Sequence, residues 1–247
     1  MGISVVFPAY NEEGNIHATV GRALEALRSL VDEFEIIIVN DSSTDATGRI
    51  ADGLALQYPE IRVIHNVKNL GQGASIILGF RQARYDLVIH NAMDYPFDLK
   101  DLGRMLAVLK GAEIVVAVRR RRAGYTLSRK VMSVVNIMLL RVLFGVRLRD
   151  CNFVQLYRKH VWDSVQIESR STAFLTPEAL IRAHDMGFRI EQVVVEYHPR
   201  EAGKATSGSF RVIFSSVRDM FRFWWNRTIR HRSEYRAQCQ KRGLGGT

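Results

Sequence analysis

Short apolar runs alternate with segments of helical periodicity along the first part of the chain. The runs lie at residues 3–7, 35–39, 62–65 and 87–90. Between the first two, apolar residues recur at Ile16, Val20 and Leu24, which is the spacing of one helix face. Because the runs are nearly continuous rather than alternating, they are typical of strands covered on both faces. We therefore predict an α/β fold with a mostly parallel sheet flanked by helices.

The rest of the chain is less regular. Its expected strands lie at 113–118, 153–157 and 189–197, and its expected helices lie at 128–146 and 177–186. A polar loop with small residues and cations follows at 198–208 and has the composition of a flexible flap. We divide the chain into a domain at 1–206, a helix at 207–232 and a flexible tail at 233–247.

The helix predicted at 207–232 combines aromatic and basic residues. Its apolar side contains Phe210, Ile213, Phe214, Val217, Met220, Phe221, Phe223, Trp224 and Trp225. Its cations include Arg211, Arg218, Arg222, Arg227, Arg230 and Arg232. A basic, aromatic and amphipathic helix is suited to a membrane interface, and the amphipathic helix at 128–146 suits the same use. The competing interpretation is a core helix with a solvated basic face.

The charge balance narrows the choice of partners. The 247 residues carry a formal charge of +10 and a pI near 9.9, which favours an anionic partner such as a nucleotide, a lipid phosphate, a membrane surface or a nucleic acid. The chain has no zinc-ligand spacing, helix-turn-helix or basic aromatic sheet signature. We therefore expect no nucleic-acid partner.

Cysteine usage and hydropathy indicate a compartment. Cys151 and Cys239 are far apart and form no CxxC motif, which suggests free thiols in a reducing environment. The most apolar stretch, 131–146, is shorter than the roughly 20 residues that a spanning helix needs. The first strand is preceded by no signal-peptide pattern. We expect a cytoplasmic protein, peripheral on the inner face of a membrane.

Asp94 follows the apolar run at 87–90, and Pro96 and Asp98 come shortly after it. In open α/β sheets, ligands bind outside the carboxyl ends of the strands. An aspartate at such an end can hold a metal ion and, through it, a phosphate. The alternative is that Asp94 only caps a turn.

Two further segments contain residues that can meet phosphate. Arg119 begins a run of four arginines directly after the strand expected at 113–118, and an arginine there is suited to a phosphate, although a solvated charge run is the competing interpretation. Gly71 and Gly73 precede an expected helix. They lack the third glycine of a dinucleotide motif, so a tight turn that opens a helix is the better interpretation.

Several motifs together resemble family-2 glycosyltransferases of the GT-A fold. They are residues 7–13 (Phe-Pro-Ala-Tyr-Asn-Glu-Glu), 36–45 (Ile-Ile-Ile-Val-Asn-Asp-Ser-Ser-Thr-Asp) and 69–74 (Asn-Leu-Gly-Gln-Gly-Ala). The segments at 150–159, 174–178 and 197–204 resemble the branch of dolichyl- or polyprenyl-phosphate sugar synthases. The resemblance covers about residues 3–223. It implies an inverting hexosyltransferase that moves a sugar from a nucleotide diphosphate to a lipid phosphate on the cytosolic leaflet.

The resemblance also implies roles for individual positions. Residues expected to bind the donor are Pro8, Ala9, Tyr10, Glu12, Val39, Asp41, Gly71, Gly73, Ala92 and Met93. Asp94 corresponds to the last aspartate of the family's Asp-x-Asp motif and is the expected ligand of Mg²⁺ or Mn²⁺. Residues expected to take part in catalysis are Asp94, Arg119, Asp150, Glu178, Arg200 and Lys204. Family members without membrane spans rely on interfacial helices or partner subunits, so a homo-oligomer or a small membrane anchor is a further expectation.

Three positions depart from the family pattern. Ala92 stands where the first aspartate of Asp-x-Asp is found, Asn40 replaces the first acid of an Asp-Asp pair, and Thr206 stands at the usual flap lysine, with Lys204 as its substitute. Losing one carboxylate weakens a divalent site, because Mg²⁺ is normally held by one or two carboxylates plus substrate phosphates. Asn91 and Asp98 are candidates to assist Asp94.

We expect a direct in-line displacement at the anomeric carbon. A metal at Asp94 and the cations Arg119, Arg200 and Lys204 neutralise the leaving diphosphate. A phosphate acceptor is already ionised at pH near 7 and needs no general base. A hydroxyl acceptor needs one, and Asp150 and Glu178 are then the candidates. The alternatives are a family-2 enzyme with a soluble hydroxyl acceptor, in a natural-product or cell-wall pathway, and a non-catalytic nucleotide-sugar-binding module.

Overall fold

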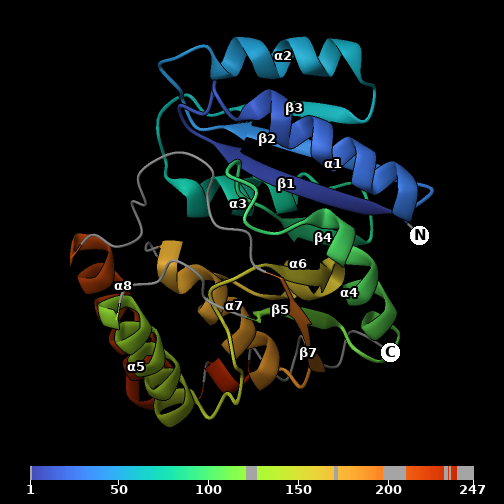
Figure 1. Cartoon of the computed structure of the whole chain (residues 1–247). Helices are drawn as coiled ribbons and strands as arrows, with labels where there is room; N and C mark the ends of the chain where they lie inside the picture. The colour runs from blue at the N-terminus through green and yellow to red at the C-terminus, as the bar shows by residue number, and fades with distance from the viewer. Residues whose placement is uncertain are drawn as a thin grey trace.

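A seven-stranded sheet forms the centre of the molecule in the computed structural model, with helices on both faces (Figure 1). The structure describes residues 2–120, 127–169, 172–196, 210–230, 233 and 235–237. The strands are β1 (Ile3–Ala9), β2 (Phe34–Asn40), β3 (Ile61–His65), β4 (Leu87–His90), β5 (Ile114–Arg119), β6 (Gln155–Arg158) and β7 (Ile190–Val195). Their order in the sheet is β3-β2-β1-β4-β6-β5-β7.

All pairings are parallel except those of β6, which runs antiparallel to both β4 and β5. A strand antiparallel to both neighbours leaves those neighbours pointing the same way. The carboxyl ends of β1 to β5 and of β7 therefore lie at one edge of the sheet. The α/β class with a mostly parallel sheet is confirmed.

The helices cover the two faces of this sheet as separate layers. They are α1 (Ile16–Leu30), α2 (Thr47–Gln57), α3 (Gln72–Arg81), α4 (Leu102–Val108), α5 (Leu127–Phe144), α6 (Lys159–Ser164), α7 (Thr172–Asp185) and α8 (Phe210–Trp225). Short 3-10 turns, η1 (Leu99–Asp101) and η2 (Leu109–Gly111), flank α4, and a π-helical segment, η4 (Asn226–Arg230), continues α8.

Each face of the sheet has its own apolar core. One core packs β1 and β2 residues such as Phe7 and Ile36 against α1, α2 and α4. The other packs Val6 and Ile37 against α3, α5, α6, α7 and α8. Successive strand residues point to opposite faces, so a strand between two cores must be apolar throughout. This explains why the strands appear as continuous apolar runs in the sequence.

Strand β1 continues through Pro8, two residues past the expected end of this strand at residue 7. The Val6 carbonyl accepts from Asn91 N, on the β4 side, and the Ala9 carbonyl accepts from Asp41 N, on the β2 side. Pro8 has the orientation of Val6, and pairing with β4 stops at Val6. The missing N–H of Pro8 therefore faces a position where the ladder has already ended, which is where a strand proline is tolerated.

Helix α7 begins at Thr172, so the predicted start at residue 177 is wrong. Pro177 lies inside the helix rather than at its first position. The preceding turn carries Phe174 and Leu175, both fully buried in the second core. Burial of these two side chains outweighs the hydrogen bond that a proline removes from the helix.

Candidate active site

The loops that follow β1 and β2 are joined by a set of hydrogen bonds. Asn11 N donates to Ser43 Oγ at 3.1 Å, and Asn11 Oδ1 accepts from Thr44 N at 2.8 Å. Glu12 N donates to Thr47 Oγ1 at 2.7 Å. Asn11 adopts a positive φ of 54°, which short polar residues tolerate. These contacts fix the two loops relative to each other before any ligand binds.

Tyr10 lies at the start of this joined pair of loops. It follows β1 directly, and its side chain is 47% exposed. Pro8, Ala9 and Val39, also expected to meet the donor, are buried in β1 and β2, and Val39 is paired with strands on both of its sides. Glu12 accepts from Asn15 Nδ2 at 2.7 Å, at the start of α1. An exposed ring beside strand ends is suited to stacking on a base.

Asp41 organises a third loop rather than pointing into open solvent. Its buried carboxylate accepts from Asn66 Nδ2 at 2.7 Å, Leu70 N at 2.9 Å and Gly71 N at 2.7 Å. Gly71 has a φ of +87°, which strongly favours glycine, and it precedes α3, whose first turn buries Gly73. The glycine pair is therefore a tight turn opening a helix, as predicted. Both Asp41 oxygens are used to hold this turn.

Asp94 lies in a tight turn after β4 that is supported from several sides. Asn91 is fully buried, donates through Nδ2 to the Phe97 carbonyl at 2.8 Å and accepts at Oδ1 from Ala92 N at 3.0 Å. Thr19 Oγ1, on α1, donates to the Met93 carbonyl at 2.6 Å. The amide of Asn91 is thus used within the turn, and Asp98 accepts from Lys100 N at the start of η1.

Asp94 is the expected ligand of a divalent ion, and few other ligands lie around it in the part of the chain that the structure describes. Among the described residues no group of three or more His, Cys, Asp or Glu side chains could hold a metal. Asp94 offers a hard carboxylate at a strand end, while Ala92 offers none. One carboxylate fits Mg²⁺ or Mn²⁺ when diphosphate oxygens and water complete the coordination. A metal is therefore compatible with this site as an ion that binds together with a phosphorylated ligand.

Arg119, the last residue of β5, forms a two-point ion pair with Asp150. Arg119 Nε lies 2.7 Å from Asp150 Oδ2, and Nη2 lies 3.0 Å from Oδ1. The guanidinium stacks over the Phe153 ring, 5.0 Å from its centroid. Because the pair is largely buried, with side chains 10% and 3% exposed, the planar cation is held in one orientation at the sheet edge.

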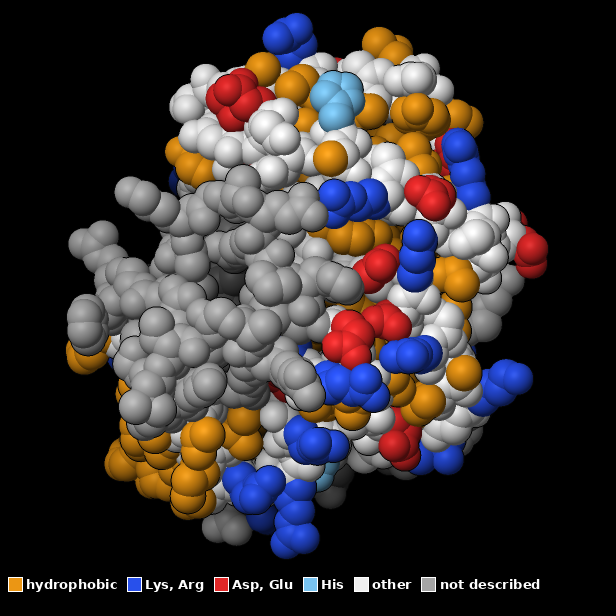
Figure 2. All heavy atoms as spheres, in the orientation of Figure 1, with side chains coloured by type: hydrophobic (Ala, Val, Ile, Leu, Met, Phe, Trp, Pro, Cys, Tyr) orange, Lys and Arg blue, Asp and Glu red, His pale blue; other side chains and the backbone are white. Residues whose placement is uncertain are grey.

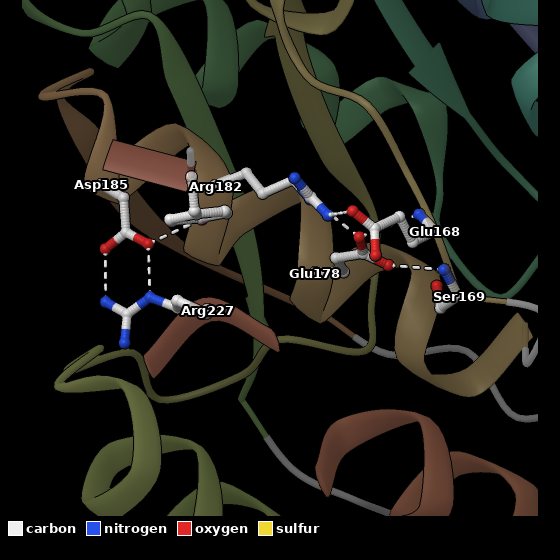
Figure 3. A network of polar contacts seen from close by, with 7 residues as sticks. Glu168, Ser169, Glu178, Arg182, Asp185 and Arg227 are labelled. Carbon is white, nitrogen blue, oxygen red and sulfur yellow. Dashed lines mark hydrogen bonds and ion pairs between the residues drawn. The ribbon is translucent and has the colours of Figure 1, made fainter. Parts of the chain in front are cut away.

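Glu178 occupies the interior of the second core and is fully buried. It accepts from the backbone N–H groups of Glu168 and Ser169 at 2.9 and 2.8 Å, and from Arg182 Nε at 2.7 Å (Figure 3). Arg182 also donates to Glu168 at 2.8 Å. Burial opposes ionisation of Arg182, but the adjacent carboxylates of Glu178 and Glu168 raise its pKa above the ordinary value. Glu178 thus fixes the segment before α7.

Arg200 and Lys204 lie outside the described residues, as do Thr206, Arg121 and Arg122. Among the described candidates, the strand ends bring Tyr10, Asp94 and Arg119 to a common sheet edge. Glu178 lies on α7 instead, and its hydrogen bonds within the described residues join it to Glu168, Ser169 and Arg182.

Two further polar groups were not singled out by the sequence. His90, the last residue of β4, packs edge-on to Phe80 with ring centroids 6.1 Å apart, and burial lowers its pKa to about 4. Asp185, at the end of α7, accepts two hydrogen bonds from Arg227 in η4. The spacing of Glu178, Arg182 and Asp185 along one helix face, at i, i+4 and i+7, was the available signal for the second.

The sequence is similar to those of known sugar-transferring enzymes. The sequence model described as glycosyl transferase family 2 matches residues 4–164. Glycosyltransferase AglD of Haloferax volcanii is 30% identical over 240 residues, which are 93% of this chain and 38% of that protein. Undecaprenyl-phosphate mannosyltransferase of Micrococcus luteus is 29% identical over 218 residues, covering 83% of this chain and 87% of that protein.

A third relative, dodecaprenyl-phosphate galacturonate synthase of Rhizobium johnstonii, is 31% identical over 234 residues, 89% of this chain and 66% of that protein. The chain thus spans well under half of one of these relatives and about two thirds of another.

Solved structures show the same fold. Glucosyl-3-phosphoglycerate synthase from Mycobacterium tuberculosis, in complex with Mn²⁺, UDP and phosphoglyceric acid, superposes with a TM-score of 0.67 at 21% identity, covering 90% of this chain and 78% of that one. Staphylococcus aureus TarS 1–349 with UDP-GlcNAc superposes with a TM-score of 0.65 at 17% identity, covering 100% and 74%.

Proposed function

Since the chain belongs to glycosyl transferase family 2, as its motifs predicted, we propose that it transfers a sugar from a nucleotide diphosphate to a polyprenyl phosphate at a membrane surface. The observation that carries this proposal is that Tyr10, Asp94 and Arg119 all lie at or after the carboxyl ends of strands that share one sheet edge. It is supported by relatives whose names specify undecaprenyl- and dodecaprenyl-phosphate products or acceptors.

The nucleotide of the donor binds on the joined loops after β1 and β2. Tyr10 supplies an exposed ring beside the backbone of Pro8 and Ala9, and the loop contacts of Asn11 and Glu12 keep this surface fixed. A preformed site loses less conformational entropy on binding than a mobile one. Structural neighbours hold UDP or UDP-GlcNAc, which supports a nucleoside diphosphate sugar as the donor.

Asp94 holds a divalent ion together with the donor diphosphate. When bound, Mg²⁺ or Mn²⁺ neutralises charge that develops on the leaving diphosphate. Arg119 adds a fixed cation at the neighbouring strand end, because Asp150 and Phe153 keep its guanidinium oriented. Arg200 and Lys204, which follow β7 in the sequence, are proposed to complete the positive surroundings.

The acceptor is proposed to be a phosphate rather than a hydroxyl. A hydroxyl needs a general base, and Asp150 and Glu178 were its candidates. Asp150 is bound at two points by Arg119, and Glu178 is bound by Arg182 and two backbone N–H groups. Both carboxylates hold other groups in place. An ionised phosphate oxygen attacks the anomeric carbon without a proton being removed first.

Helices α5 and α8 supply the proposed membrane surface. Among the described side chains of α5, α8 and η4, nine large apolar ones are exposed, namely Met132, Val134, Val135, Met138, Val142, Phe214, Phe221, Trp225 and Ile229. We call this set the apolar face. Phe144 of α5 stacks on Phe223 of α8 with centroids 5.6 Å apart, so the two helices lie side by side. Figure 2 shows hydrophobic side chains gathered at the lower left, where Figure 1 places these helices.

The charge around the apolar face suits an anionic leaflet. Within residues 132–144 and 214–230, the described side chains include one acid, Asp219, which is buried, whereas Arg141, Arg218, Arg222 and Arg230 are exposed. Basic residues beside a buried apolar face add electrostatic attraction to anionic lipid. No helix that the structure describes is both long and apolar enough to cross a bilayer. We propose peripheral binding to the inner face of a membrane, with a second copy or a small anchor subunit as alternative occupants.

The experiment is a donor panel with and without lipid. GDP- and UDP-sugars are incubated with the chain, with vesicles with or without undecaprenyl phosphate, and with Mg²⁺, Mn²⁺ or chelator. We expect one donor to be consumed only when lipid phosphate and metal are present, and Asp94→Asn to abolish this turnover. Equal turnover with a water-soluble alcohol instead identifies a hydroxyl acceptor. If the donor binds without turnover and Ala92→Asp restores turnover, the missing carboxylate had inactivated the site.

A further inference from the structure

The inward face of α7 carries charged residues at positions where a helix usually has apolar ones. Glu178, Arg182 and Asp185 follow one another at i, i+4 and i+7 and point inward; we call them the α7 polar stripe (Figure 3). Glu178 and Arg182 are buried, and the Asp185 side chain is 13% exposed. Charges in such positions cost free energy unless each is paired, so their partners show what the stripe holds.

The partners of the α7 polar stripe come from two different regions. At its N-terminal end, Glu178 holds the backbone of Glu168 and Ser169, as described above. At its C-terminal end, Asp185 accepts from Arg227 Nε at 2.7 Å and Nη2 at 2.6 Å, and from the Tyr235 hydroxyl at 2.8 Å. The stripe thus joins the segment before α7 to the segment after α8.

Asp185 stands in a position that local rules disfavour. It is the last residue of α7, and a carboxylate at a helix C-terminus meets the negative end of the helix dipole. Arg227 offsets this cost through two charge-assisted hydrogen bonds, and these bonds, with the nearby carboxylate, raise the pKa of Arg227 despite its burial. Asp185 is unfavourable for the helix end but forms a long-range ion pair with Arg227. This indicates that the ion pair is the role of Asp185.

The same arginines hold both helices of the apolar face. The Arg227 guanidinium lies over the Phe144 ring of α5 at 5.7 Å, and Arg182 lies over the Phe223 ring of α8 at 4.7 Å and the Tyr235 ring at 5.4 Å. Contact of a guanidinium with an aromatic face is attractive and directional. Helices α5 and α8 are therefore fixed to α7 by the two cations as well as by apolar packing.

From this arrangement we propose that Asp185 is a positioning residue for the membrane-bound acceptor. Its pairing with Arg227 sets the angle between the apolar face and the sheet edge that carries Asp94 and Arg119. This inference rests on the proposed function, in which the lipid chain stays in the bilayer while its phosphate reaches that edge. Loss of the pair leaves the chemical site intact but lowers the effective concentration of the lipid phosphate at it.

The test separates a positioning role from a structural one. Asp185→Asn, Arg227→Gln and the double variant are assayed with undecaprenyl phosphate in vesicles of phosphatidylcholine and phosphatidylglycerol, and with soluble geranyl phosphate. We expect each variant to raise the KM for the vesicle-bound acceptor by about tenfold and to leave kcat and KM for geranyl phosphate within about twofold. Because the two side chains act as one unit, the double variant loses no more than a single variant.

A matched control removes a surface ion pair elsewhere. Arg28 donates from Nε and Nη2 to Glu60 on the opposite part of the molecule, and Arg28→Gln is expected to change neither acceptor's KM. Equal losses for both acceptors in Asp185→Asn overturn the proposal in favour of a structural role. An unchanged KM of Asp185→Asn for the vesicle-bound acceptor overturns it as well. In both cases the proposed function still stands if the wild-type chain transfers sugar to the lipid phosphate.

A second readout does not depend on turnover. Quenching of Trp225 emission by brominated lipids, in a Trp162→Phe and Trp224→Phe background, reports how the apolar face lies in the bilayer. We expect Asp185→Asn to change the depth profile of quenching. If the profile is the same with and without the ion pair, the pair does not orient the face, whether or not the lipid is the acceptor.

Discussion

Arg119 and Asp150, 31 residues apart in the chain, meet at two points at the edge of the sheet, with nitrogen–oxygen distances of 2.7 and 3.0 Å. Together with Glu178, Asp150 was a candidate general base in the case of a hydroxyl acceptor. The geometry favours another use, in which the carboxylate orients a cation that meets phosphate. The two roles predict different behaviour when the carboxylate is changed.

Asp150→Asn is expected to lower kcat/KM by about 10²-fold, because Arg119 loses the partner that fixes its guanidinium. Weakening this buried ion pair also costs about 3 kcal/mol of folding free energy. Steady-state kinetics and urea unfolding measure the two effects. The shape of the pH–rate profile stays unchanged if Asp150 only orients Arg119. A profile that loses its acidic limb in the variant identifies a base instead.

Asp41→Asn is expected to destabilise the loop that opens α3. The carboxylate accepts from two backbone N–H groups and one side-chain amide, and hydrogen bonds to a charged group contribute about 1.5–3 kcal/mol each. An amide oxygen replaces only part of this, so we expect a loss of about 2 kcal/mol and a raised donor Kd. Urea unfolding and donor titration measure both.

The control for Asp41 is Asp52→Asn on α2, which weakens an exposed contact to His65 of β3. Because exposed pairs contribute little, this variant should unfold at the wild-type urea concentration. Equal destabilisation by both variants contradicts the role assigned to Asp41.

His90 makes stability depend on pH. Burial lowers its pKa to about 4 in the folded chain, whereas an unfolded histidine has a pKa near 6.5. The folded state therefore binds fewer protons between these values, and stability present above pH of about 6.5 is lost as the pH falls toward about 4. The shift corresponds to about 3 kcal/mol.

Urea unfolding at several pH values tests this assignment. His90→Asn should flatten the decline between about pH 6.5 and 4, because asparagine takes up no proton in this range. His17→Asn, at an exposed position on α1, serves as the control and should keep the wild-type slope. A decline that persists in His90→Asn shows that other groups cause it.

Phe214→Ser and Trp225→Ser together are expected to weaken binding to anionic vesicles by about tenfold or more, because each removes a large apolar side chain from the apolar face. Phe214 is 72% exposed, so its loss costs the folded state little. Vesicle flotation measures the effect, and added salt should weaken the remaining binding. Leu56→Ser, at a 91% exposed residue of α2, removes a comparable apolar group away from this face and should float like the wild type.

Local patterns in the chain determined the strands, most helices and the turn chemistry. The continuous runs at 36–39 and 87–89 predict buried strands because both faces of the sheet are covered. Gly71 predicts a tight turn because a positive φ there suits a residue without a side chain. The motifs around Tyr10, Asp41 and Gly71 identified the family, since each is a short segment whose residues act together.

Tertiary structure alone decided which distant groups meet. The insertion of antiparallel β6 between β4 and β5 brings Arg119 close to Asp150, and no periodicity in either segment encodes that register. Asp185 and Arg227 lie 42 residues apart, so their pairing depends on how α8 packs on α7. Sequence periodicity reports which face of an element is buried, whereas the partner of a buried charge on another element is set by how whole elements pack. That packing pairs Asp150 with Arg119 and Asp185 with Arg227.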